Sequence, residues 1–274
     1  MSSQDGTTPE LPLRPAHHDR HSQGEPVVSL PADAVMASSL LPSDAQLIRE
    51  AISALMQSPD PQRPGQAIGG SKAGIYAFYD YDKEPIYVGQ TAVGFAIRLG
   101  RHLMSGRSDA VAQSILDPFE IREVALWSLP HIGDMPAKER KAALDPYEYT
   151  VFERLVSESS FHALLNERLV PPSTVVDLPD PFVGVIVPDE VFPNRNHPDV
   201  RIARRVQTMS QLAKFICERK VSLGLRRTLA TQALRLEEIT RRRLNALTQV
   251  DRHHGFERGG TLEVFEKEPD GSLF

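Results

Sequence analysis

A β-hairpin that carries one tyrosine on each strand is the feature that most constrains the fold of this chain. Residues 74–81 (Gly-Ile-Tyr-Ala-Phe-Tyr-Asp-Tyr) have a strand-forming composition, and a polar turn leads into a second strand at 85–91. Tyr76 and Tyr87 fall on opposite strands, eleven positions apart, so their side chains can face one another across the hairpin. The hairpin therefore predicts an antiparallel pair of strands around which the neighbouring segments pack.

Helix and strand patterns follow the hairpin. Apolar residues of 95–104 lie on one side of a predicted helix, and Arg98 and His102, four positions apart, are neighbours on one face. A third strand is predicted at 119–129. The next helix is expected to begin at Asp145, an N-cap residue followed by proline at the first helical position. These elements predict an α+β fold, with a small three-stranded, mainly antiparallel sheet flanked by helices.

The chain changes character several times along its 274 residues. Its first segment is polar and Pro-rich and follows neither structural period, which is typical of disorder. Apolar residues then repeat at helical spacing from Ser43, and near the other end two amphipathic stretches separated at 222–224 predict a helical hairpin. We therefore expect a disordered N-terminal segment (1–42), a helical arm with a Pro-rich loop (43–66), the α+β core (67–170), a Pro-rich connector (171–198), a basic helical region (199–255) and a tail (256–274).

Basic charge is concentrated in the C-terminal helical region. The whole chain has a net charge of -5, which offers no global attraction to a polyanion. Residues 199–243 nevertheless contain 12 Lys and Arg against 4 Asp and Glu, whereas residues 72–180 contain 11 against 16. Such a patch suits the phosphates of nucleic acid, with helix packing, dimerisation or a solvated helix face as the alternatives. The candidate nucleic-acid contacts are Arg204, Arg205, Arg226, Arg227, Arg241, Arg242 and Arg243.

Cysteine content and hydropathy bear on the compartment. The lone Cys217 excludes an intramolecular disulfide framework and lacks the companions of a Cys-rich zinc site, which indicates a reducing compartment. No run of 18 apolar residues occurs, and residues 1–20 lack the apolar stretch of a signal peptide. We expect a cytoplasmic protein without membrane association.

Several short motifs occur in a fixed order around the hairpin. They are Gly74-Ile75-Tyr76, Tyr87-Val88-Gly89, Arg98-Leu99 with His102-Leu103, and an acidic residue on a later helix followed by Asn166. In this combination, over about residues 72–168, the chain resembles the GIY-YIG nuclease superfamily. The resemblance implies a small α+β nuclease core that hydrolyses phosphodiester bonds with the help of a divalent cation, Mg²⁺ or Mn²⁺.

The resemblance also implies a role for each motif residue. Tyr76 would lie near the attacking water as its general base or its positioner, and Tyr87 and His102 would belong to the hydrogen-bond network around it. Arg98 would contact the scissile phosphate, and Asn166 would order the site. These residue types suit the chemistry, because cleavage requires an activated water and stabilisation of developing charge. Strand aromatics packed across a sheet, a surface salt bridge at Arg98 and a structural histidine are the alternatives.

The resemblance implies one glutamate as the only protein ligand of the metal, and two glutamates compete for that place. Glu148 is followed at helical spacing by two apolar residues, as in the family, with a capping-box role as the alternative. Glu153 lies thirteen residues before Asn166, closer to the family distance than the eighteen of Glu148. We favour Glu148, because Glu153 would turn away from the helix face that Val151 and Leu155 share.

The expected function is that of a metal-dependent endonuclease acting on double-stranded DNA. The order of arm, Pro-rich loop and basic hairpin resembles the layout of restriction enzymes in the superfamily, which favours a role in defence. Repair and homing nucleases share the core, and the core does not record the role. The alternatives are a non-catalytic nucleic-acid-binding or assembly subunit that keeps the fold, and a homo-oligomer joined through the C-terminal helices.

Overall fold

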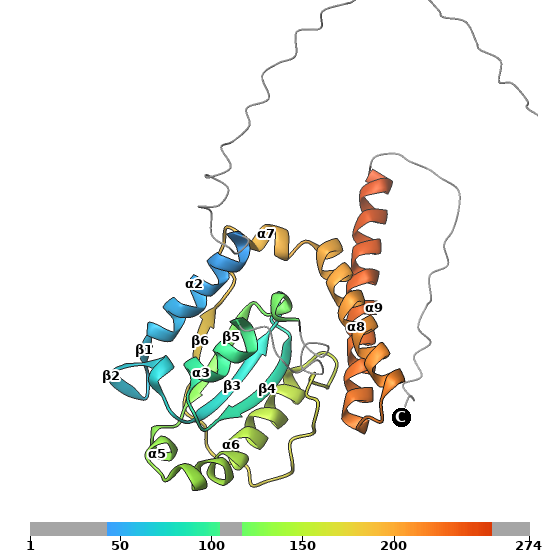
Figure 1. Ribbon diagram of the computed structural model, residues 1–274. Coiled ribbons are helices and arrows are strands. Elements are labelled where there is room, and N and C mark those ends of the chain that lie inside the picture. The colour runs from blue at the N-terminus through green and yellow to red at the C-terminus, as the bar shows by residue number, and fades with distance from the viewer. Residues whose placement is uncertain (1–42, 105–116, 254–274) are drawn as a thin grey trace, which may run out of the picture. The chain divides into compact units, whose positions relative to one another are not determined.

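The structure is a computed structural model that describes residues 43–104 and 117–253 (Figure 1). These residues are all part of one compact unit, and their fold is of the expected α+β type. The predicted disordered segment 1–42 and tail 256–274 lie outside the described residues. The elements are α2 (Ser43–Gln57), β1 (Pro59–Asp60), β2 (Arg63–Ala67), η1 (Ile68–Gly70), β3 (Gly74–Tyr79), β4 (Pro85–Thr91), α3 (Phe95–Leu99), η2 (Gly100–Met104), η3 (Pro118–Glu120), β5 (Glu123–Ser128), α5 (Pro130–Gly133), α6 (Ala137–Glu158), β6 (Phe182–Val185), α7 (Phe192–Arg195), α8 (Pro198–Glu218) and α9 (Leu223–His253).

The central sheet has four antiparallel strands in the order β4-β3-β5-β6. The predicted hairpin is confirmed as β3 and β4, which pair Tyr76 with Gly89 and Phe78 with Tyr87. The prediction of three strands is wrong, because β6 pairs with β5 and adds a fourth strand from within the Pro-rich connector. The prolines flank this strand and do not interrupt it, so its backbone is free to complete the ladder.

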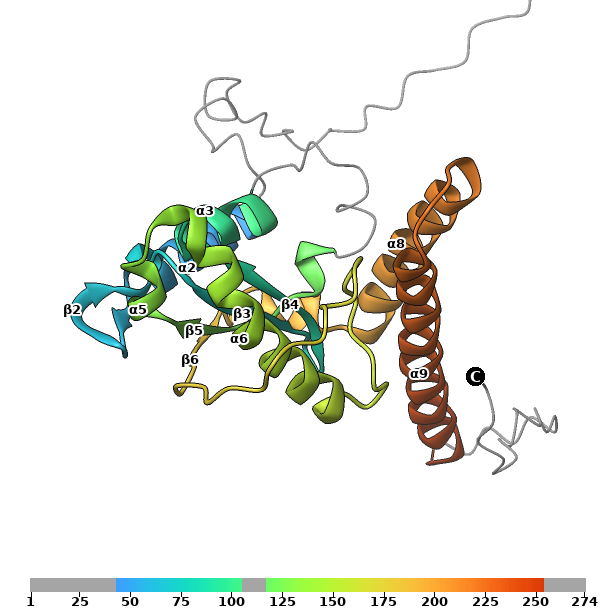
Figure 2. The same ribbon diagram turned by 90° about the horizontal axis from the view of Figure 1, so that it is seen from below.

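Helices cover both faces of this sheet (Figures 1 and 2). On one face, Tyr76 and Phe78 of β3 pack in a core with apolar residues of α2 and α3, including Phe95 and Leu99. The alternate residues of β3 point to the other face, because successive strand side chains point in opposite directions. There they form a second core with Leu144, Val151 and Leu155 of α6. The edge strand β4 therefore lies between α3 on one face and α6 on the other.

Helix α6 begins earlier than expected. The prediction that Asp145 caps its N-terminus is wrong, because the helix starts at Ala137 and contains Pro146 in its interior. The preceding residues Ala137–Leu144 are mostly strong helix formers, and Leu144 is fully buried, so propensity and packing extend the helix upstream. Consequently Glu148 lies in the fourth turn, and its expected alternative as a capping-box residue no longer applies.

The C-terminal helices form the predicted αα-hairpin of α8 and α9. Its inner side carries arginines that are almost fully buried: Arg201, Arg205 and Arg235 are 3%, 4% and 2% exposed. All three reach Asp80 at the end of β3, at N–O distances of 3.4, 3.0 and 2.6 Å respectively. Arg205 also donates to Glu120 at 3.0 Å. A buried ionic cluster therefore joins the hairpin to the sheet.

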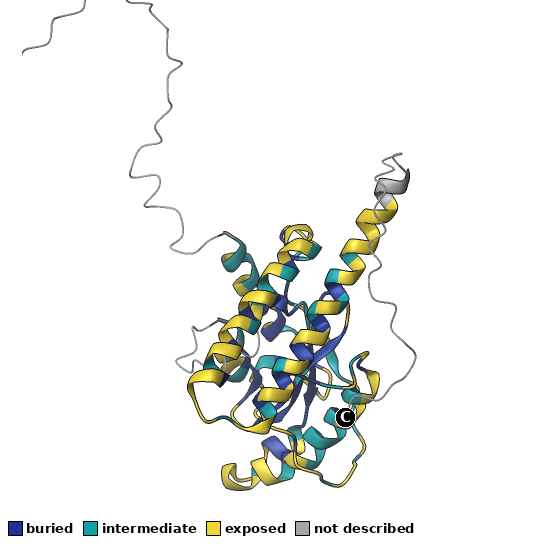
Figure 3. Cartoon of the chain, turned by 90° about the vertical axis from the view of Figure 1, so that its right-hand side faces the viewer, coloured by how far each residue is buried: buried dark blue, intermediate teal, exposed yellow. Residues whose placement is uncertain are grey.

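The long helix α9 is buried only along one side (Figure 3). Leu225, Thr228, Arg235 and Ile239 are buried at helical spacing, and the opposite side faces solvent. Within the described residues, no helix is both long enough and apolar enough to span a membrane.

Candidate active site

The two motif tyrosines lie together on the α3 side of the sheet. Their rings are stacked, with centroids 6.1 Å apart and planes inclined by 29°. Tyr76 is fully buried, whereas Tyr87 on the edge strand is partly exposed. Burial and the neighbouring Tyr87 raise the pKa of Tyr76 well above its usual value, although Arg98 acts in the opposite direction. The Tyr76 phenol is therefore neutral at physiological pH.

Gly89 makes room for the Tyr76 ring. A Cβ atom at Gly89 would lie 2.5 Å from the Tyr76 hydroxyl oxygen, and the tyrosine cannot retreat because it is enclosed on all sides. We expect Gly89→Ala to lower the free energy of unfolding by about 1–3 kcal/mol through overpacking. Urea denaturation measures this loss. Gly70→Ala is the control, because a Cβ at Gly70 meets no atom within 4 Å; equal losses in the two variants would contradict the packing argument.

Arg98 is held by a tyrosine hydroxyl. Arg98 lies on α3, and its Nε donates to the Tyr76 hydroxyl oxygen at 3.0 Å. Burial alone would lower the pKa of Arg98, but the Tyr76 oxygen and the Glu148 carboxylate raise it overall. The guanidinium is therefore a fixed cation whose Nε is occupied and whose two Nη groups make no hydrogen bond to the part of the chain that the structure describes. Two parallel Nη donors match the geometry of a phosphate.

Glu148 reaches the same strand from the opposite face. Gln90 of β4 donates from its Nε2 to the Glu148 Oε2 at 2.7 Å and to the Asp145 Oδ1 at 2.8 Å. Burial raises the pKa of Glu148, and Asp145 raises it further, while Gln90 and Arg98 lower it. Gln90 and Asp145 did not emerge as site residues from the sequence. Gln90 could have been found, since it is polar and shares the α6-facing side of β4 with the buried Val88.

The oxygen atoms around Glu148 suit a hard divalent cation. Mg²⁺ takes oxygen ligands and is held by one or two carboxylates together with water and substrate phosphate. Glu148 and Asp145 offer two carboxylates within hydrogen-bond reach of one amide, and the Gln90 Oε1 is buried without a hydrogen-bond partner among the described residues. In the described parts of the chain, no group of three or more His, Cys, Asp or Glu side chains is arranged so that it could hold a metal ion. Glu148 and Asp145 are thus the groups that fit the ion.

The second glutamate lies elsewhere. Glu153 is exposed on α6, past the buried Val151 and on a different side of the helix. Glu148 and Arg98 act on one another electrostatically, whereas Glu153 does not contribute to the electrostatics of either. His102 belongs by its backbone to η2, but its side chain lies outside the described part of the structure, so the prediction for it stands as made.

The side chain of Asn166 forms hydrogen bonds with the backbone along the outer edge of β4. Its Nδ2 donates to the Val88 carbonyl oxygen at 2.8 Å, and its Oδ1 accepts from the Val88 N–H at 3.2 Å. The neighbouring Leu165 N–H donates to the Ile86 carbonyl oxygen at 2.8 Å. The side chain of Asn166 therefore makes the two backbone hydrogen bonds with Val88 that a neighbouring strand would make. Val88 lies between Tyr87 and Gly89, so this contact agrees with an ordering role for Asn166.

The candidate DNA-binding arginines divide into two groups. The expectation that Arg205 contacts nucleic acid is not met, because it is buried against Asp80 and Glu120. Four others are bound to carboxylates of the same chain: Arg204 to Asp117, Arg241 to Glu237 and Glu238, Arg242 to Asp82 and Glu238, and Arg243 to Asp199. Arg226 and Arg227 are exposed and form no ion pair with any residue in 43–104 or 117–253.

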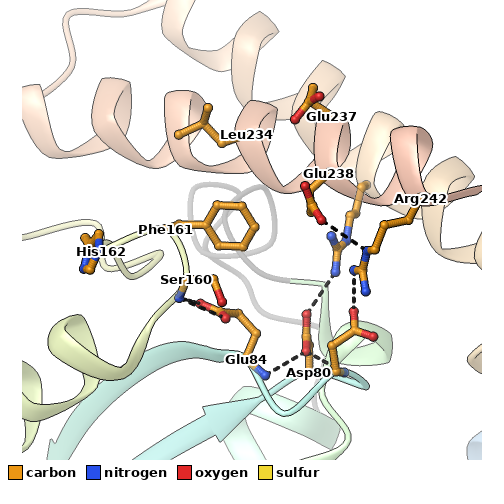
Figure 4. Close-up of a pocket in the computed structure, with 11 residues that line it drawn as sticks. Asp80, Glu84, Ser160, Phe161, His162, Leu234, Glu237, Glu238 and Arg242 are labelled. Atoms are coloured by element: carbon orange, nitrogen blue, oxygen red, sulfur yellow. Dashed lines mark hydrogen bonds and ion pairs between the residues drawn. The ribbon is translucent and has the colours of Figure 1, made fainter. Parts of the chain in front are cut away.

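A cavity of about 580 Å³ lies on the other side of the charged cluster, between the β3–β4 turn, residues 160–162 and α9 (Figure 4). Five carboxylates line it against two arginines. Its acidic groups already have donors, since Glu84 accepts from the Ser160 N–H and Arg242 lies between Glu238 and the turn (Figure 4). An acidic lining repels phosphate, so this cavity does not compete with the end of β4 as a site for a phosphodiester.

Comparison with protein-family models, curated proteins and solved structures gives no match for this chain. The side-chain arrangement at β4 is therefore the basis for any functional conclusion.

Proposed function

We propose that this protein is a metal-dependent DNA endonuclease of the GIY-YIG type. The observation that supports this most is the chain of contacts around β4: the rings of Tyr76 and Tyr87 stack, Arg98 donates to Tyr76, and Gln90 near the end of β4 donates to Glu148. The two tyrosines and Arg98 lie on one face of the sheet, and the Glu148 carboxylate of α6 reaches the end of β4 from the other face. A phosphate placed at that end could contact a guanidinium and a metal-binding carboxylate at once.

In the proposed mechanism, Arg98 binds the scissile phosphate through its Nη groups and stabilises the charge that develops on the phosphorus oxygens. Tyr76 fixes Arg98 through its Nε. The raised pKa of Tyr76 favours the positioning role over that of a general base, because a phenol that stays protonated does not accept the proton of water. Tyr87, the more exposed of the two, orients the attacking water.

Glu148, with Asp145 beside it, would hold the Mg²⁺ or Mn²⁺ ion. When bound, the ion supplies Lewis-acid stabilisation of the departing oxygen and lowers the pKa of a bound water. Gln90 positions both carboxylates through one amide nitrogen. Since burial and Asp145 disfavour the ionised form of Glu148, a cation at this position would relieve a cost that the free site carries.

Incubation of the purified full-length chain with plasmid DNA and Mg²⁺ tests the proposal, with the cut ends mapped. We expect nicking or linearisation that EDTA abolishes. DNA binding without metal-dependent cleavage, across duplex and branched substrates, would favour the non-catalytic alternative, and the absence of both would overturn the proposal. Cut ends at a fixed sequence would support the proposed role in restriction and defence.

A matched pair of variants locates the metal. We expect Glu148→Gln to reduce the cleavage rate at least about 100-fold and to weaken Mg²⁺ binding in calorimetry, because the neutral amide loses the charge that attracts the ion. Glu153→Gln removes an equal charge from an exposed position on the same helix and should leave both within about twofold. The reverse result would assign the metal to Glu153.

A further inference from the structure

The turn between α8 and α9 lies beside the candidate active site. We call residues 218–228 the hairpin tip. A Cβ atom at Gly224 would overlap the Glu167 carbonyl oxygen, so the tip packs directly on the segment that follows Asn166. The Thr228 hydroxyl also donates to the Asn166 carbonyl oxygen at 3.3 Å. Because the Asn166 side chain binds Val88 of β4, two short contacts connect the tip to the strand that carries Tyr87.

Positive charge gathers at this tip. Residues 218–228 contain four Lys and Arg against one Glu. Lys220, Arg226 and Arg227 are exposed and form no ion pair within the described parts of the chain, and the same is true of Arg168, which follows Glu167. Arg219 is also exposed and stacks on the ring of Phe215, with its guanidinium carbon 4.5 Å from the ring centroid. These cations are not neutralised by neighbouring carboxylates.

Up to residue 249, the rest of the hairpin offers no comparable surface. Arg201, Arg205 and Arg235 are buried on Asp80, and the arginines at 241–243 are each paired with a carboxylate. Most of the arginines that give this region its positive charge are therefore paired with carboxylates of the same chain. The cations of the tip remain available to bind a partner. The tip adjoins β4, the strand that carries Tyr87.

We propose that the hairpin tip, together with Arg168, binds backbone phosphates of duplex DNA flanking the bond that is cut at the end of β4. The inference rests on the proposed nuclease function and names the surface that holds its substrate. Unpaired Lys and Arg neutralise phosphates and release counterions, which supplies most sequence-independent affinity for DNA. The small core has a net negative charge over 72–180, and the exposed cations of the tip lie beside it.

The test measures binding of a labelled duplex by fluorescence anisotropy over a salt series. The full-length chain carries Glu148→Gln throughout, so that the DNA stays uncut. We expect Arg226→Gln/Arg227→Gln to raise Kd about tenfold and to reduce the slope of log K against log salt by about 2, because two phosphate contacts are lost. Arg168→Gln/Lys220→Gln should have an effect of the same kind on an independent part of the surface.

The control is Arg241→Gln/Arg243→Gln, which removes the same charge from the same helix roughly 20 Å along its axis. We expect its Kd to stay within about twofold, since both arginines are already paired with carboxylates. The inference would be overturned if DNA binding weakened equally in the tip and control variants, or if it weakened in neither tip variant. Cleavage of DNA by the unmodified chain would still support the proposed function in that case. A chain that neither binds nor cuts DNA would overturn both.

Discussion

Arg98→Ala is expected to abolish metal-dependent cleavage, with a loss of at least about 1000-fold in the rate at saturating DNA. A guanidinium that stabilises charge in a phosphoryl transition state contributes on this scale. Here the side chain is held by the Tyr76 hydroxyl and shares the site with Glu148. Single-turnover cleavage of a short labelled duplex measures the loss without interference from product release.

Two further variants separate the role of Arg98 from plain structural damage. Tyr76→Phe removes only the hydroxyl that accepts from the Arg98 Nε, so the rate should fall about 10- to 100-fold while DNA affinity stays within about twofold. Arg154→Ala is the control, because Arg154 is exposed and pairs with Glu158 one turn away on α6. Undiminished cleavage by both Arg98→Ala and Tyr76→Phe would refute the site assignment.

Asp80→Asn is expected to lower the free energy of unfolding by about 3–5 kcal/mol. This substitution keeps the shape of the side chain but removes the charge that three buried arginines share. Removing one partner of a buried ion pair is strongly destabilising, because the remaining charges stay desolvated and uncompensated. Arg205 and Arg235 would then face one another with Glu120 as the main remaining counterion.

Urea denaturation followed by circular dichroism measures this effect. Asp199→Asn is the control, because Asp199 is an exposed carboxylate that pairs with Arg243 on the same hairpin. Solvent screens an exposed ion pair, so the control should be nearly neutral. A similar small change in both variants would show that the cluster does not hold the hairpin to the sheet.

The sequence predicted the parts of the fold that have local signals. The hairpin of β3 and β4 follows from alternating strand-forming residues around a polar turn, and the α8–α9 hairpin follows from helical spacing. The start of α6 was wrong because Asp145-Pro146 has the form of a helix start, whereas burial of Leu144 extends the helix upstream. Strand β6 was missed as a sheet member because its partner β5 lies more than fifty residues away.

The same distinction applies to the site. Tyr76, Tyr87, Arg98 and Glu148 were predicted from motif order; in the structure the two tyrosine rings stack, Arg98 donates to Tyr76, and Glu148 accepts from Gln90 of β4. The Asp80 cluster was not predicted, because Arg201 and Arg235 lie 121 and 155 positions from their partner and no periodicity links them. Several of the arginines that a count of charges assigns to DNA therefore form ion pairs within the fold.

The Asn166 contact with Val88 also determines how β4 meets the surroundings. An edge strand with unpaired backbone groups invites a strand from another molecule, and natural sheets cover or interrupt such edges. The N–H of Val88 and the carbonyl oxygens of Ile86 and Val88 are already occupied by residues 165 and 166. Residues 165 and 166 therefore hinder the addition of another strand along this edge of β4. Their hydrogen bonds reach as far as Val88, two residues before Gln90, so they leave the strand free next to the carboxylates that Gln90 binds.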